Sequence, residues 1–229
     1  MNHNEIARPA RERLLASAER LFAEKGYNGV SVRDIASDAK VTVGSIRYHF
    51  GSKEDLLKAV FERLVRPLSD QRKERMEYVF RQSRGKNLDI RDVLEAAMEP
   101  VFRLSRENDT YRRMIGRSST DPTAEVKKVM RELYRTGKTN VHKALRRACP
   151  HLSRKEFYWR YFCYYGATQY VLADVGRMQM IAGNSFDTSD PEVALKFVMP
   201  FLAAGFLAPG IIGKKKKTAT KKAVRSKRA

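Results

Sequence analysis

Several residues on one short predicted helix carry side chains suited to contacts with nucleic acid. A helix of about residues 43–49 is too polar to be core, although Ile46 and Phe50 give it an apolar side. Arginine can form a bidentate hydrogen bond to guanine, serine can bond to either base edge, and tyrosine and histidine can reach bases or phosphates. Gly44 is a poor helix former, yet it lets backbone approach phosphate closely. The candidate contacts on and beside this helix are Thr42, Val43, Gly44, Ser45, Arg47, Tyr48 and His49.

The exit from this helix offers a candidate phosphate contact. Ser52 is expected to cap the next helix, whose first residue is Lys53. A lysine beside the free N–H groups of a helix N-terminus favours phosphate, because the helix dipole and the side-chain charge act together. We therefore expect Lys53 to contact the DNA backbone, and we add Arg33, on the preceding short helix, as a further candidate DNA contact.

Two helices before residue 43 must position these side chains. Apolar residues recur at helical spacing between residues 9 and 25, and Gly26 follows as a stop signal. Ser31 is the candidate N-cap of a short second helix, a tight connection follows at Lys40, and Thr42 is the candidate N-cap of the third. Two short helices braced by a longer one fit the helix-turn-helix pattern. Most short amphipathic helices have no such role, so periodicity alone leaves DNA binding open.

The remainder of the chain also has helical periodicity almost throughout, which predicts an all-α protein of about nine helices. A fourth helix starts at Lys53 and should kink or break near Pro67, and a fifth is interrupted at Pro100. The sequence predicts a DNA-binding domain over 1–52 and a helical domain over 53–209. The remaining helices are expected at about 110–118, from Pro122 to about Ala148, from Ser153 to about Ile181, and from Pro191 onward.

The charge of the chain is concentrated at its end. The sequence has 229 residues, and 46 Lys and Arg residues outnumber 26 Asp and Glu residues, for a formal net charge of +20. The last sixteen residues, 214–229, hold nine basic and no acidic side chains. Such a segment cannot bury enough apolar surface to become ordered, so we expect a disordered tail over 210–229. A polyanion such as DNA or RNA is its natural partner, while a purely solubilising role stays open.

Several other classes of protein are disfavoured. Hydrophobic residues make up 42% of the chain, which is typical of a globular protein, yet no run approaches the roughly 18 apolar residues of a membrane span. The N-terminus lacks the apolar stretch of a signal peptide. Cys149 and Cys163 cannot build a disulfide framework, and no zinc-ligand spacing is present. We therefore expect a cytoplasmic, nucleoid-associated protein that uses neither a membrane nor a metal.

Catalysis is also poorly supported. The thirteen glycines form neither a GxGxxG nor a GxxxxGK[ST] phosphate loop. The four histidines do not pair with a nucleophile at any recognisable spacing. We expect no enzymatic activity, no catalytic residue and no cofactor.

The residues around the third helix carry a family resemblance. The run VTVGSIRYHFGSKEDLLKAVFERL, preceded by GYNGVSVRDIASDAK, resembles the DNA-binding region of the tetracycline-repressor (TetR) family. The resemblance implies a homodimeric, ligand-released regulator that binds double-stranded DNA. It also implies DNA contacts at Thr42, Val43, Ser45, Tyr48 and His49, with Lys53 on the backbone. Many members carry tyrosine where this chain has Arg47, which leaves the operator sequence open.

The second half resembles a narrower branch of that family, the fatty-acid-responsive regulators. The stretches HLSRKEFYWRYFCYYGATQYVLADVGRM and DTSDPEVALKFVMPFLAAGFLAP carry this resemblance. It implies a small apolar effector, such as a fatty acid or an acyl thioester. A polar group is needed to orient such a ligand, and the candidates are His142, Arg113 and Tyr165. The last two predicted helices are apolar around much of their circumference, which fits a homodimer interface built from both subunits. The candidate lining of the effector pocket is Met98, Phe102, Met114, Met130, Leu133, Tyr134, Trp159 and Phe162.

Two competing functions remain open at this point. A nucleoid-type protein dominated by its lysine-rich tail would bind DNA with little sequence preference and without two-fold symmetry. An interaction module or enzyme with a helix-turn-helix-like head would protect no DNA site at all.

Overall fold

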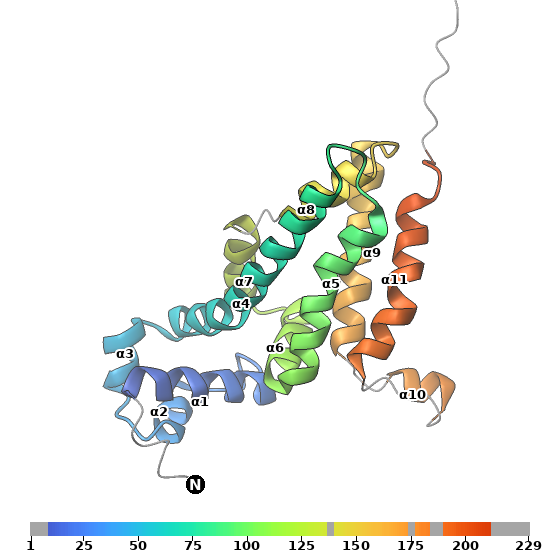
Figure 1. Cartoon of the computed structure of the whole chain (residues 1–229). Coiled ribbons are helices and arrows are strands. Elements are labelled where there is room, and N and C mark those ends of the chain that lie inside the picture. Colours follow the sequence, from blue (N-terminus) through green and yellow to red (C-terminus); the bar gives the residue numbers. More distant parts are fainter. Residues whose placement is uncertain (1–8, 137–139, 174–176, 184–189, 212–229) are drawn as a thin grey trace, which may run out of the picture.

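The chain folds into an all-α protein, which confirms the predicted fold class. The computed structural model describes residues 9–136, 140–173, 177–183 and 190–211, and within these ranges it contains eleven helices and no strand (Figure 1). The helices are α1 (Ala10–Lys25), α2 (Val32–Asp38), α3 (Gly44–Phe50), α4 (Lys53–Gln82), α5 (Ile90–Glu107), α6 (Asp109–Thr120), α7 (Ala124–Thr136), α8 (Asn140–Ala148), α9 (Arg154–Ala173), α10 (Arg177–Ala182) and α11 (Pro191–Leu207).

The first three helices form a compact head at one end of the molecule (Figure 1). The predicted cap at Ser31 is confirmed: its side chain accepts a hydrogen bond from the backbone N–H of Asp34, whose carboxylate accepts one from the backbone N–H of Ser31. The predicted cap at Thr42 is wrong, because Val43 occupies the N-cap position and no side chain caps α3. The Thr42 hydroxyl instead hydrogen-bonds the hydroxyl of Ser45 at 3.1 Å.

Prolines inside α4 and α5 do not end these helices. Of the predicted kink or break near Pro67, the break does not occur, since α4 continues from Lys53 to Gln82, whereas a kink agrees with the change of direction of α4 in Figure 1. The predicted interruption at Pro100 is wrong, because α5 runs through it. A proline removes one backbone hydrogen bond, and a bend relieves the clash of its ring with the preceding turn. Packing of α5 against α4 and α11 then holds both helices together.

Two predicted helices are each divided in the structure, so the described count is eleven instead of about nine. The helix expected from Pro122 to Ala148 is divided into α7 and α8, and the helix expected from Ser153 to Ile181 into α9 and α10. Residues 137–139 and 174–176, between these pairs, lie outside the described residues. The spacing of apolar residues predicted a single helix there because α7 and α8 both bury residues in the same core.

Helix α5 is central to the larger, C-terminal part of the molecule, where it packs against α4, α6, α8, α9 and α11. Its residues Leu94, Met98 and Phe102 are fully buried. Within the described ranges, no helix combines the length and apolar character needed to cross a membrane. Most of the predicted tail over 210–229 lies outside the described residues, which end at Ile211.

Candidate nucleic-acid interface

Helix α3 has one buried and one exposed side, and it lies at the far end of the head (Figure 1). Ile46 is only 3% exposed and anchors the helix in the core, whereas Tyr48 is 85% exposed. Thr42, Val43 and Arg47 are exposed as well. A large aromatic ring held in solvent beside a buried anchor is available to an external partner, so the predicted polarity of this helix is confirmed.

Aromatic rings cluster at the C-terminal end of α3. The ring of Tyr48 contacts that of His49 edge-to-face at a centroid distance of 4.9 Å, and His49 lies 6.3 Å from Phe50. The guanidinium of Arg11, in the first turn of α1, lies 5.2 Å from the centroid of the Phe50 ring. Arg11 is an exposed cation beside α3 that the sequence analysis missed. Its sequence signal was weak, since it is one of several basic residues near the start of α1.

Lys53 is directed toward the interior of the head. Its Nζ donates a hydrogen bond to the backbone oxygen of Tyr27 at 2.7 Å and lies 3.9 Å from the centroid of the Tyr27 ring. Partial burial lowers the pKa of Lys53, while the carboxylates of Glu125 and Asp34 act to raise it. An ammonium group has three donors, so a contact with phosphate remains compatible with this geometry. The phosphate role of Lys53 therefore stays a prediction, and so does that of Arg33, which is exposed on α2.

The turn between α2 and α3 sets the direction of the exposed helix. Lys40 has a φ of 53°, in the left-handed region that non-glycine residues rarely adopt. The Arg13 guanidinium on α1 donates to the backbone oxygen of Lys40 at 3.4 Å. The backbone N–H of Val41 donates to the oxygen of Ala36 at 3.0 Å, which closes the turn. These contacts hold a strained turn against α1 and so fix α3 relative to α2.

A network of polar contacts connects the head to the rest of the molecule. Helix α4 starts directly after α3, and its N-cap Ser52 accepts a hydrogen bond from the backbone N–H of Asp55. Two ion pairs, which we call the α4–α7 pairs, join this end of α4 to α7. They connect Glu54 with Lys128 at 2.8 Å and Lys58 with Glu132 at 2.9 Å.

Helix α6 adds a further connection, because Arg117 donates to the backbone oxygen of Glu24 at the end of α1 at 2.9 Å. Helices α6 and α7 are therefore in direct contact with the helices that hold α3.

The predicted lining of the effector pocket is divided between the core and the surface. Met98 and Phe102 are fully buried, Met114 is 3% exposed, and Met130 and Leu133 are partly buried. Trp159 and Phe162 are 62% and 66% exposed, so their assignment to an interior pocket is wrong. They lie on the side of α9 opposite its buried residues. The sequence did not reveal this, because aromatic residues occur all around the helix. The side chain of Tyr134 lies outside the described residues.

The three candidate orienting residues differ in their surroundings. Arg113 is exposed and forms an ion pair with Asp109 at 2.6 Å, so it does not face the interior. His142 is enclosed by the rings of Phe157, Tyr158 and Tyr161, and Tyr165 is partly buried.

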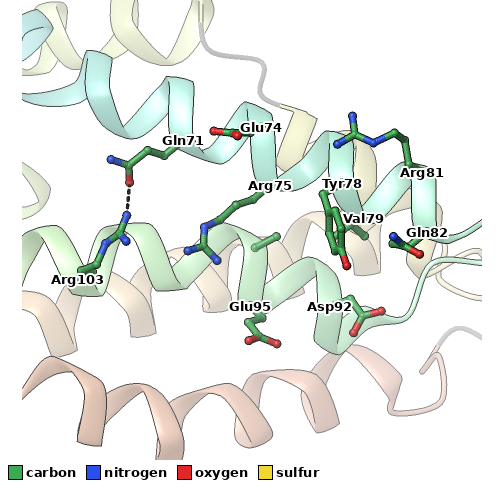
Figure 2. Close-up of a pocket in the computed structure, with 11 residues that line it drawn as sticks. Gln71, Glu74, Arg75, Tyr78, Val79, Arg81, Gln82, Asp92, Glu95 and Arg103 are labelled. Atoms are coloured by element: carbon green, nitrogen blue, oxygen red, sulfur yellow. Dashed lines mark hydrogen bonds between the residues drawn. The ribbon is translucent and has the colours of Figure 1, made fainter.

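A groove that the sequence did not indicate runs between α4 and α5 (Figure 2). It has a volume of about 750 Å³, and most of the residues that line it are charged or carry an amide. Arg103 donates to the Gln71 side chain across the groove at 2.8 Å, and Arg75 pairs with Glu99 at 2.7 Å. Because this groove lies on the surface and is rich in charge, it differs from the apolar interior site that the sequence predicts.

Large apolar side chains are exposed along α9 and α11. On α9, Trp159 and Phe162 face solvent, and on α11 Phe197 and Phe201 are each 73% exposed. We call this surface the α9–α11 face. Large apolar side chains exposed on two helices that pack against each other are typical of a protein–protein interface. The face comprises Tyr158, Trp159, Phe162, Tyr170, Val193, Phe197, Phe201 and Leu207.

Two family models match this chain. The model described as "Bacterial regulatory proteins, tetR family" matches residues 14–60, which span the head and the first part of α4. The model described as "Tetracyclin repressor-like, C-terminal domain" matches residues 95–205. The chain belongs to the TetR family. The exposed α3 and the helices that brace it form the helix-turn-helix of this family of transcriptional regulators.

Curated relatives match over part of this chain. The "HTH-type transcriptional dual regulator CecR" of Shigella flexneri is 32% identical over 120 residues, which cover 50% of this chain and 53% of that protein. The "HTH-type transcriptional regulator UidR" of Escherichia coli is 35% identical over 54 residues, or 24% of this chain and 28% of that protein. The chain thus spans about half or less of the length of these relatives.

Solved structures of TetR-type proteins share the fold at low sequence identity. The fatty acid degradation regulator FadR from Bacillus halodurans has a TM-score of 0.59 and 16% identity, with 86% of this chain and 96% of that chain covered. The FadR of Bacillus subtilis, solved in complex with stearoyl-CoA, has a TM-score of 0.55 and 16% identity, with 85% and 98% covered. At these identities the comparison establishes the fold alone.

Proposed function

We propose that this protein is a ligand-released transcriptional repressor that binds an inverted-repeat operator as a homodimer. The observation that carries the proposal is the two-sided α3, in which Ile46 is buried while Arg47 and Tyr48 face solvent. An exposed helix at the end of a molecule fits the major groove, where arginine and tyrosine reach base edges and phosphates. DNA binding associates the protein with the nucleoid in the cytoplasm.

The α9–α11 face supplies the dimer interface in this proposal. Phe197, Phe201, Trp159 and Phe162 are exposed on two neighbouring helices that pack against each other. A two-fold interface brings the same patch of each subunit together, so these side chains become buried against their symmetry mates. Two copies of α3 then meet successive major grooves about 34 Å apart, and the operator is an inverted repeat.

An apolar effector is the second part of the proposal. Met98, Phe102 and Met114 give α5 and α6 a flexible apolar interior, which is the type of lining that a hydrophobic ligand needs. Two of the structural neighbours are fatty-acid regulators, and one was solved with stearoyl-CoA. We infer that the ligand favours a conformation in which the two α3 helices no longer match the grooves, and that DNA release follows from this difference in affinity.

The basic tail adds affinity that does not depend on sequence. Residues 214–229 carry nine positive charges, and each phosphate contact releases counterions from DNA. Deletion of 214–229 should therefore reduce the slope of log affinity against log salt while the operator preference is kept. An unchanged slope would mean that the tail does not contact DNA.

A genome-wide binding-site selection with the purified full-length chain tests the proposal. We expect a small set of sites with two-fold symmetry. A flat distribution without symmetry would instead support the nucleoid-type alternative, and no protected site would reject DNA binding altogether. Arg47→Ala should cost about 1–3 kcal/mol at the preferred sequence if Arg47 reads a base, whereas a uniform loss over all sequences would identify a phosphate contact. Arg66→Ala, at an exposed arginine of α4, is the matched control.

A further inference from the structure

Arg72 is a half-buried cation on α4 without a carboxylate partner. Its Nε donates to the backbone oxygen of Ala97 on α5 at 2.8 Å. Among the described residues, no Asp or Glu pairs with it and no second protein acceptor is recorded for its guanidinium. The neighbouring Arg75 and Arg103, by contrast, are engaged by Glu99 and Gln71. Among the described residues, Arg72 is thus the arginine of this cluster that has no side-chain partner.

Buried phenols lie within reach of the charge of Arg72. Tyr111 of α6 is 1% exposed and Tyr164 of α9 is 4% exposed, and the ring of Tyr161 lies 5.7 Å from that of Tyr164. Burial raises the pKa of Tyr111 and of Tyr161 to about 12, and the positive charge of Arg72 opposes this shift at both. Burial also raises the pKa of Tyr164, again against the charge of Arg72. These phenols are therefore protonated at neutral pH and able to donate hydrogen bonds.

A positive charge in this half-buried position destabilises the folded protein unless an anion binds beside it. An uncompensated, partly buried charge destabilises a protein, and such costs are typical of sites that serve a ligand. A guanidinium presents parallel N–H groups that match the two oxygens of a carboxylate. The surroundings of this cation are apolar on the side of α5, because Met98 follows Ala97 directly and is fully buried.

The number of charges indicates which anion fits. Among the described residues, Arg72 is the one basic residue whose charge acts on Tyr111, Tyr161 and Tyr164. A single positive charge balances a monoanion, whereas the phosphates of an acyl-CoA thioester carry several negative charges, and its acyl carbonyl carries none. We propose that Arg72 binds the carboxylate of a free acid with an apolar chain, between α4, α5, α6 and α9. This inference rests on the apolar effector of the proposed function and names its polar group.

Binding of matched ligands to the full-length protein tests the inference. The probes are dodecanoate and hexadecanoate, their methyl esters and their CoA thioesters, measured by isothermal titration calorimetry below the aggregation limit of each. The wild type should bind a free acid at least tenfold more tightly than its methyl ester. Arg72→Gln should weaken acid binding on the order of 10- to 150-fold and leave ester binding unchanged, because only the acid loses a charged hydrogen bond. Arg72→Lys should recover part of the affinity.

Arg81→Gln is the matched control, since Arg81 is an exposed arginine on the same helix, and it should bind the acids like the wild type. Equal binding of acid and ester by the wild type overturns the inference even if Arg72→Gln does not fold, and it leaves the apolar effector intact. Preference for the thioester, or an Arg72→Gln variant that keeps full acid affinity, overturns it as well. If acids, esters and thioesters all fail to bind, the apolar effector of the proposed function fails with it, while the site selection still decides DNA binding independently.

Discussion

Two residues of α3 that are two positions apart should respond in opposite ways to truncation. Ile46 is 3% exposed, so Ile46→Ala removes apolar carbons from the core of the head and should cost about 2–5 kcal/mol. In a chain of this size, each kcal/mol lowers the melting temperature by roughly 2–4 °C, which gives a decrease of roughly 4–20 °C. Tyr48 is 85% exposed and loses mainly its edge contact with His49. Tyr48→Ala should therefore cost no more than about 1 kcal/mol of stability.

DNA binding should show the reverse order. Tyr48→Ala should weaken binding to the selected operator by about 5- to 150-fold, which corresponds to the loss of roughly 1–3 kcal/mol of contact energy. Ile46→Ala should bind normally at a temperature where its head is still folded. Thermal melts by circular dichroism and fluorescence anisotropy with labelled operator at one fixed salt concentration measure both effects. If Tyr48→Ala melts as early as Ile46→Ala, or if it keeps full operator affinity, α3 is not the exposed reading surface.

Three further predictions follow from other parts of the structure. Lys40→Gly should raise the melting temperature by roughly 2–4 °C, because relief of the left-handed φ gains about 1 kcal/mol; a decrease would mean that the turn is not strained. Burial raises the pKa of Tyr111 and Tyr161 to about 12, so the folded state keeps protons that the unfolded state releases near pH 10. Stability should fall as the pH rises from about 10 to 12, and denaturant titrations across this range would detect it. Lys58→Glu places two negative charges at the Lys58–Glu132 pair and should weaken operator binding. The double variant Lys58→Glu/Glu132→Lys restores opposite charges and should restore binding. If the single and the double variant bind the operator equally, this pair has no role.

The sequence predicted the fold class because apolar spacing and caps are local signals. The head contains helices at nearly the predicted positions, since a buried stripe such as that of α1 and a capping box such as Ser31 with Asp34 depend on neighbouring residues alone. The interruption predicted at Pro100 was wrong, because the packing of α5 outweighs the loss of a single hydrogen bond there, and at Pro67 helix α4 likewise continues. Such compensation comes from contacts distant in sequence, and local pattern cannot reveal it.

The sequence indicated the exposed side of a helix only where its polar and apolar residues lie on different sides. The exposed side of α3 followed from a polar stretch interrupted by one buried isoleucine. Trp159 and Phe162 were wrongly predicted to be buried because α9 is aromatic around its circumference, and periodicity then does not indicate which side of the helix faces the core. Arg72 was missed since an arginine on a charged helix is usually solvated, and its isolation from carboxylates is a property of the folded molecule.

Helix α4 joins the reading helix, the α4–α7 pairs and Arg72 in one element. From Lys53 to Arg72 it spans nineteen residue steps, or about 29 Å at a rise of about 1.5 Å per residue. A rotation of about 5° at Arg72 would displace the start of α4 by up to about 2.5 Å, and α3 ends only three residues before it. Donor–acceptor distances in hydrogen bonds vary by only about 0.5 Å, so a displacement of this size breaks contacts with base edges. A ligand that rotates α4 by a few degrees at Arg72 therefore has enough leverage to release DNA.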